Sequence, residues 1–214
     1  MMRVWHRYLH CDPLTSKGKG EGVTMKRIVL LSCWLIAAMG EIAQARECRG
    51  VAFPDHLQVN GNDLALNGLG MRKATFLKVN VYVGALYVAH PGADPLPLID
   101  PGTPARLILH FVRNVGVGDL RDAWQEGFEK VAKEGMPALS SRIATLNGWM
   151  SSMETGQRLT FTRLPGAGIQ VDVNGLVKGT IPGDDFARAL MSIWLGPKPP
   201  NPELKSGLLG GSCG

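Results

Sequence analysis

The chain has 214 residues, with 23 Lys and Arg, 18 Asp and Glu and a formal charge of +5. Six of the cations and three of the anions lie in residues 1–45, so residues 46–214 carry 17 cations and 15 anions, a net charge of +2. A charge this small, without a basic cluster, argues against a nucleic-acid partner. The remaining length suits one domain with one hydrophobic core.

The start of the chain has the pattern of a secretory leader. Residues 25–27 form a short basic region, residues 28–40 are an apolar run, and residues 43–45 read Ala-Gln-Ala. This combination predicts a signal peptide over residues 25–45 that is cleaved after Ala45.

Two further expectations follow from the leader. Met25 could start the signal unaided, so residues 1–24 read as an upstream extension, and the true start is either Met1 or Met25. The alternative is an uncleaved membrane anchor, which the shortness of the apolar run disfavours. Cleavage would leave a single domain at 46–214, periplasmic or secreted, with no stable transmembrane segment.

Two cysteines, Cys48 and Cys213, lie near the two ends of this domain. In an oxidising compartment such a pair can close a disulfide. Two free thiols are the alternative, because sequence alone does not show that the ends meet. Their spacing is unlike that of a zinc site, and we expect neither a metal nor a cofactor.

The first part of the domain is predicted to be β-structure. Residues 57–66 read as a hairpin about an Asn-Gly turn. Residues 75–89 are apolar on both faces, which is typical of a covered central strand. Five prolines make residues 90–104 a loop, and residues 105–112 form another strand.

The hydrophobic period then changes to three or four residues, which is typical of helices. It predicts one amphipathic helix over residues 119–134, with Asp119 as a candidate cap. Pro137 can begin a second helix, with an apolar stripe that reaches residue 150.

The last part of the chain predicts three strands and a final helix. Residues 158–164, 168–173 and 176–181 read as a three-strand meander with short turns. A helix over residues 186–195 follows, with acidic residues before it and Gly196 after it. The element order lacks β-α-β alternation, so the predicted class is α+β, an antiparallel sheet with helices on one face.

Few residues have the pattern of a catalytic site. The domain has three histidines, His56, His90 and His110, which lie far apart without metal-ligand spacing. Each is more typical of a surface or packed histidine than of a ligand. No G-x-S-x-G motif is present, and neither cysteine has a local base.

Arg72 and Tyr82 are the candidate ligand-binding residues. Residues 66–72 read Leu-Asn-Gly-Leu-Gly-Met-Arg, which predicts a glycine-rich turn that delivers Arg72 to the start of the strand bearing Tyr82. Arginine is always charged and forks onto carboxylates and phenolates, which suits an anionic head on an apolar ligand. The alternative is a surface arginine, or one paired with an internal carboxylate.

Taken in order, these segments resemble the chalcone isomerase-like superfamily in its bacterial exported branch. The matching segments are 53–54, 66–72, 78–88, 119–127, 156–161, 181–187 and 193–210. The resemblance implies an open-faced β-sandwich: a large antiparallel sheet, a layer of helices over one face, and a ligand cleft between them.

The resemblance also implies roles for individual residues. In plant chalcone isomerases, an arginine at this place attracts the ligand phenolate, and a strand threonine with a helix tyrosine and lysine completes the site. In the fatty-acid-binding relatives, the arginine and a strand tyrosine hold a carboxylate. Arg72 matches the shared arginine, and Tyr82 stands where the binders have tyrosine. Residues 120–127 offer neither the helix tyrosine nor the lysine at a matching position.

The leading hypothesis is therefore a non-catalytic, exported protein that binds a fatty acid or a similar carboxylate-headed amphiphile. The first alternative is an isomerase (an intramolecular lyase) acting on a chalcone-like phenolic or enone substrate. The second is a structural or partner-binding envelope protein, whose cleft would be filled by side chains and whose Arg72 would pair with an internal carboxylate.

Overall fold

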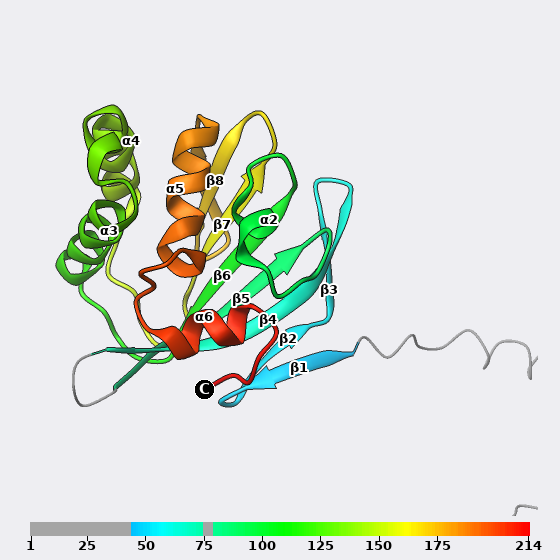
Figure 1. Ribbon diagram of the computed structural model, residues 1–214. Coiled ribbons are helices and arrows are strands. Elements are labelled where there is room, and N and C mark those ends of the chain that lie inside the picture. Colours follow the sequence, from blue (N-terminus) through cyan, green and yellow to red (C-terminus); the bar gives the residue numbers. More distant parts are fainter. Residues whose placement is uncertain (1–43, 75–78) are drawn as a thin grey trace, which may run out of the picture. The chain divides into compact units, whose positions relative to one another are not determined.

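The computed structural model describes residues 44–74 and 79–214 (Figure 1). The predicted upstream extension and nearly all of the predicted signal peptide lie outside the described residues, as do residues 75–78 of the predicted strand at 75–89. Within the described part of the chain, no helix has both the length and the apolar character needed to cross a bilayer.

A seven-stranded antiparallel sheet forms the centre of the fold, and its strand order follows the chain order. Its strands are β3 (His56–Val59), β4 (Asn62–Ala74), β5 (Val79–Val88), β6 (Ala105–Phe111), β7 (Arg158–Leu164), β8 (Gly168–Val173) and β9 (Leu176–Ile181). A separate two-stranded sheet, which the sequence pattern did not predict, joins β1 (Ala45–Cys48) to β2 (Val51–Pro54).

Three long helices cover one face of this sheet. They are α3 (Val117–Val131), α4 (Met136–Trp149) and α5 (Asp184–Leu195), with the short 3-10 helix η1 (Lys133–Gly135) between the first two. Figure 1 shows α5 over the sheet, with α3 and α4 beside it. The main hydrophobic core lies between helices and sheet, and α5 contributes the buried Phe186, Leu190 and Trp194. The predicted α+β class is confirmed.

The predicted β3–β4 hairpin is also confirmed. Asn60 and Gly61 join the two strands, with φ values of 50° and 79°. Both residues of a type I′ turn need positive φ, which is why Asn-Gly is favoured there. A second, smaller core lies on the other face of the sheet and contains side chains of β3 and β4. The β1–β2 hairpin helps to cover this core with Cys48 and Phe53.

The glycine-rich turn predicted at residues 66–72 is wrong, because β4 continues through it to Ala74. The glycines serve the approach of helix α6 (Pro202–Leu208) instead. A Cβ at Gly68 would lie 2.1 Å from the carbonyl oxygen of Gly207, and one at Gly70 would lie 2.4 Å from that of Leu204. Glycine is thus needed where a helix backbone touches the strand.

Two other predicted boundaries differ from the structure. Helix α3 begins at Val117, its N-cap is Gly116, and Asp119 lies in its first turn without capping it. The proline-rich loop contains the short helix α2 (Pro95–Ile99), whose cap is Asp94: its carboxylate accepts from the N–H of Leu96 at 3.0 Å. Proline at the first helical positions is compatible with a helix start, so a proline count alone does not exclude a short helix.

The two ends of the described chain meet. Cys48 of β1 and Cys213 form a disulfide with a Cα–Cα distance of 5.8 Å, across 165 residues of sequence. In Figure 1 the C-terminus lies beside β1, after α6 has crossed β4. The disulfide closes nearly the whole domain into one covalent loop.

Candidate functional site

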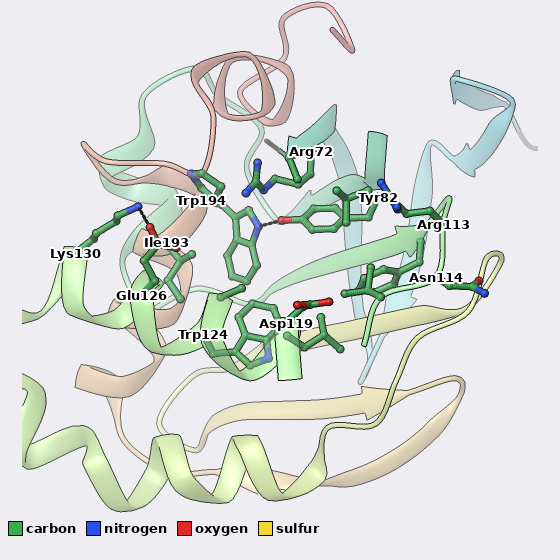
Figure 2. A pocket seen from close by; sticks show the side chains of 18 of the residues that line it. Arg72, Tyr82, Arg113, Asn114, Asp119, Trp124, Glu126, Lys130, Ile193 and Trp194 are labelled. Atoms are coloured by element: carbon green, nitrogen blue, oxygen red, sulfur yellow. Dashed lines mark hydrogen bonds and ion pairs between the residues drawn. The ribbon is translucent and has the colours of Figure 1, made fainter. Parts of the chain in front are cut away.

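A cavity of about 510 Å³ opens between the sheet and helices α3 and α5 (Figure 2). Strands β4, β5 and β6 form its floor, α3 and α5 form its wall, and the segment after α5 contributes Lys198 and Pro200. Both candidate ligand-binding residues predicted from the sequence, Arg72 and Tyr82, line it.

Arg72 and Tyr82 are direct partners in the β4–β5 register, and Phe111 of β6 is the next partner in the same row. Directly opposed residues of antiparallel strands place their side chains on the same face. The row therefore presents a guanidinium, a phenol and a phenyl ring to the cavity. Figure 2 shows Arg72 and Tyr82 adjacent there, and a guanidinium N–H of Arg72 donates to the carbonyl of Lys73.

Tyr82 is a buried phenol whose hydroxyl is held from one side. Trp194 Nε1 donates to its oxygen at 2.9 Å, and its ring meets Phe111 edge-on at 5.6 Å. Burial raises the pKa of Tyr82 to about 12, although the Trp194 bond and the charge of Arg72 act in the opposite direction. The hydroxyl is thus protonated at neutral pH, and the described residues show no acceptor for its hydrogen.

Aromatic rings line the cavity on the helix side. Trp124 of α3 packs edge-on against Trp194 at 5.8 Å and against Phe161 of β7 at 5.7 Å. Close packing of α3 on α5 is possible because Gly127 has no side chain: a Cβ there would lie 3.1 Å from Ile193. These contacts set the distance between the helices and give the cavity an apolar wall.

Charged side chains also line the cavity. Four lining residues are cationic and two are anionic: Arg72, Arg113, Lys130, Lys198, Asp119 and Glu126. Lys130 pairs with Glu126 at 2.5 Å, and this pairing, with a smaller effect of Arg72, lowers the pKa of Glu126. Among the described residues, no carboxylate lies within 4.0 Å of the other three cations.

This arrangement differs from the one expected of a structural envelope protein. That hypothesis required a cleft filled by side chains and an Arg72 paired with an internal carboxylate. The cleft has an open volume, and in the described part of the chain Arg72 donates to the backbone carbonyl of Lys73.

Two lining residues have contacts that the sequence pattern did not indicate. The sequence favours Trp194 as a residue that packs a helix on the sheet, with a place in the lining of a pocket as the alternative; the structure adds its hydrogen bond to the Tyr82 hydroxyl. Lys130 lies three residues beyond segment 120–127, where the resemblance would place a helix lysine, and it lines the cavity. Its spacing of four from Glu126 and seven from Ala123, which also line the cavity, was a usable signal, because helix positions three, four and seven apart share a face.

The histidines lie away from the cavity. His110 faces the opposite side of the sheet beside Phe53, and burial together with Arg158 lowers its pKa. His56 pairs with Asp63 at 3.2 Å on the surface. In the residues that the structure covers, no cluster of three or more His, Cys, Asp or Glu could hold a metal ion.

Comparison with known proteins agrees with this architecture. The model of the family described as chalcone isomerase-like matches residues 45–210. The structure is similar to that of a fatty-acid binding protein from Arabidopsis thaliana, with a TM-score of 0.64 and 18% identity over 78% of this chain and 96% of the other. Among curated proteins, no sequence matches the chain.

Proposed function

The chain belongs to the chalcone isomerase-like family, and we propose that it binds a fatty acid or a similar carboxylate-headed amphiphile in the cavity beside α3. One observation carries the proposal: Arg72 and Tyr82 are cross-strand partners that face the same apolar-walled cavity. The structural similarity to a fatty-acid binding protein supports it at the level of the fold.

The head group would be held by two kinds of donor. The Arg72 guanidinium offers a charged fork, and charge-assisted bonds to carboxylates are roughly twice as strong as neutral ones. The Tyr82 hydroxyl already accepts from Trp194, so its own hydrogen remains for a ligand oxygen. A carboxylate oxygen accepts from both donors, whereas an alcohol of the same chain length lacks the charge that Arg72 would neutralise.

The apolar body would lie along the helix wall. Besides Arg72 of the sheet, the lining includes the apolar side chains of Val115, Leu120 and Trp124. The volume of 510 Å³ is within the range of about 300–1,000 Å³ that is usual for small-molecule sites. Burying each methylene group of a chain there would contribute about 0.8 kcal/mol.

The engagement of the helix lysine favours binding over isomerisation. Closing a ring on an enone needs several donors arranged around its carbonyl and an attacking phenolate of the substrate held in place. With a pKa of about 12, Tyr82 is protonated at neutral pH and supplies one such donor beside Arg72. Lys130, the lysine that α3 contributes to the cavity, is engaged by Glu126. A spectrophotometric chalcone-to-flavanone assay tests this alternative, and Arg72-dependent turnover would establish it.

We also propose that the protein is exported. The signal-peptide pattern at residues 25–45 supports this, and so does the Cys48–Cys213 disulfide, because disulfides persist mainly in oxidising compartments. Cell fractionation and the intact mass of the purified protein test it. The expected product lies outside the cytoplasm and begins at Arg46; a cytoplasmic protein that retains the leader would contradict it.

Binding is tested on delipidated protein by calorimetry with a long-chain fatty acid and the alcohol of equal length. The proposal requires tighter binding of the acid and a loss of about tenfold or more for the acid in Arg72→Gln, since a charged hydrogen bond contributes roughly 1.5–3 kcal/mol. The matched control is Arg188→Gln, which removes one exposed arginine from α5 outside the cavity. No acid binding by the wild type, or equal losses in both variants, would refute the proposal.

A further inference from the structure

We propose that the C-terminal segment, residues 201–214, positions Arg72, and that the Cys48–Cys213 disulfide holds this segment in place. The head-group preference of the cavity would then depend on a covalent bond on the far side of β4 from β5. The inference rests on the proposed function, because it concerns how strongly Arg72 selects an anionic head.

Strand β4 has a long edge that β3 leaves unpaired. Strand β3 pairs with β4 only at residues 62–65, whereas β4 continues to Ala74. The Asp55 carbonyl accepts from the N–H of Leu66, and farther along that edge the C-terminal segment supplies the hydrogen-bond partners of Met71. The N–H of Met71 donates to the carbonyl of Cys213 at 3.0 Å, and the carbonyl of Met71 accepts from the Asn201 side chain at 3.3 Å.

The two bonds of Met71 lie next to Arg72. Met71 immediately precedes Arg72, and the β4–β5 register shifts directly after Arg72. Beyond that irregularity the described part of the ladder with β5 has two pairs, Lys73 with Asn80 and Ala74 with Val79, so support from the other edge of β4 would help to hold the backbone at Arg72. Side chains that recognise ligands must be held within about 0.5 Å of their productive position, which a loosened strand edge would not achieve.

Packing of α6, a buried hydrogen bond and the disulfide hold the C-terminal segment against β4. Helix α6 lies against Gly68 and Gly70, where a Cβ would overlap its backbone. The buried Asn67 side chain donates to the carbonyl of Leu208 at 2.7 Å. The acceptor for Met71 belongs to Cys213 itself, so the disulfide to the buried Cys48 restrains the residue whose carbonyl supports the strand.

The test compares the acid-over-alcohol affinity ratio among variants of the whole protein. In Cys48→Ser/Cys213→Ser, which leaves neither residue of the pair as a free thiol, we expect the ratio to fall about tenfold while the alcohol binds within about twofold of wild type. Asn201→Ala keeps the disulfide and should lower the ratio by a few-fold. It keeps the proposal testable if the double variant does not fold.

A matched control and a direct structural measurement complete the experiment. Arg49→Gln removes the side-chain bonds to the Gly214 carbonyl, at 2.7 and 3.2 Å, without touching Met71, and should leave the ratio unchanged. Hydrogen exchange at the Met71 amide should be faster in the double serine variant than in Arg49→Gln.

The outcomes separate the two proposals. An unchanged ratio in the double serine and Asn201 variants, with a ratio that still collapses in Arg72→Gln, would overturn the positioning role and leave the binding function intact. Equal weakening of acid and alcohol would show a merely structural role and would also overturn it. A wild-type protein without acid preference would refute the proposed function and this inference together.

Discussion

The indole Nε1 of Trp194 donates a 2.9 Å hydrogen bond to the hydroxyl oxygen of Tyr82, and so joins helix α5 to strand β5 across 112 residues of sequence. Both groups are buried, with exposed fractions of 1% and 8%. The indole has a single N–H, so this bond satisfies it, and it leaves the phenol with a hydrogen to donate into the cavity. The same contact thus supports the packing of α5 and orients a candidate ligand donor.

Replacing Tyr82 by phenylalanine should affect both stability and binding. Tyr82→Phe leaves the buried indole N–H of Trp194 without an acceptor, which should cost about 1–3 kcal/mol in the free energy of unfolding. It also removes one donor to the ligand, and we expect fatty-acid affinity to fall by roughly two- to tenfold. Urea unfolding and calorimetry measure the two effects.

The control for this prediction is Tyr87→Phe. The Tyr87 hydroxyl donates to the carbonyl of Pro54 at 2.8 Å, in the core on the other face of the sheet. This variant should lose stability while keeping its affinity for the acid. Equal affinity losses in the two variants would contradict the assignment of Tyr82 to the site.

The protein should lose stability in alkali through its two buried tyrosines. Burial raises the pKa of both Tyr82 and Tyr87 to about 12 from an unfolded value of 10.0. Because the folded pKa is the higher one, the associated stability is complete below pH 10 and is lost as the pH rises toward 12. A shift of this size corresponds to roughly 2–3 kcal/mol for Tyr82 and to less for Tyr87, whose hydroxyl lies closer to solvent and to charged side chains.

Ultraviolet titration of tyrosinate measures these pKa values directly. In the folded protein, absorbance from these two tyrosines should rise with midpoints near 12, and the Tyr82→Phe/Tyr87→Phe variant should lose this component. A midpoint at the ordinary value for either residue would show that its hydroxyl is open to solvent. Fatty-acid binding between about pH 6 and pH 9 should show no titration of Tyr82.

Gly70 should be intolerant of a side chain, whereas its partner Gly84 should be tolerant. A Cβ at Gly70 would lie 2.4 Å from the Leu204 carbonyl oxygen, so Gly70→Ala must displace α6 and should cost about 1–3 kcal/mol or more. Gly84 is its direct neighbour on β5, and a Cβ there would make ordinary van der Waals contacts: the ends of two leucine side chains at 3.4 and 3.5 Å and the Gly70 carbonyl oxygen at 3.7 Å. Thermal unfolding of both variants tests the difference; equal shifts would contradict it.

Asp185 should stabilise the protein more than its neighbour Asp184. Arg142 donates to both carboxylate oxygens of Asp185, at 2.7 and 2.6 Å, and this pairing lowers the carboxyl pKa to about 2. Solvent screens the pair because Asp185 is 58% exposed, so Asp185→Asn should cost no more than about 1 kcal/mol.

The stability that the Arg142–Asp185 pair contributes depends on pH. Because the pairing lowers the Asp185 pKa, this stability is present above about pH 4, the ordinary carboxyl range, and is lost as the pH falls toward 2. Asp184→Asn removes an acid from the same helix turn without touching Arg142, and it isolates the effect of the pair. If the two variants have the same stability at pH 7, the Arg142 contact contributes nothing measurable.

Local patterns in the sequence determined most of the secondary structure and the chemistry offered to a ligand. The meander at 158–164, 168–173 and 176–181 matches β7, β8 and β9 residue for residue, because alternation and Asn-Gly or Pro-Gly turns are local signals. Arg72 and Tyr82 were recognisable because a charged fork and a phenol stand out in an apolar segment.

Only the tertiary structure decided how those residues are used. Gly68 and Gly70 contact the backbone of α6, which lies more than 130 residues later in the chain. Local sequence does not show this contact, so the glycines suggested a turn where the strand β4 is continuous. Trp194 holds Tyr82, and Cys213 supports the residue beside Arg72, through contacts that span more than 100 residues. Local periodicity follows from backbone geometry, whereas the partners of a buried polar group depend on which distant segments pack together.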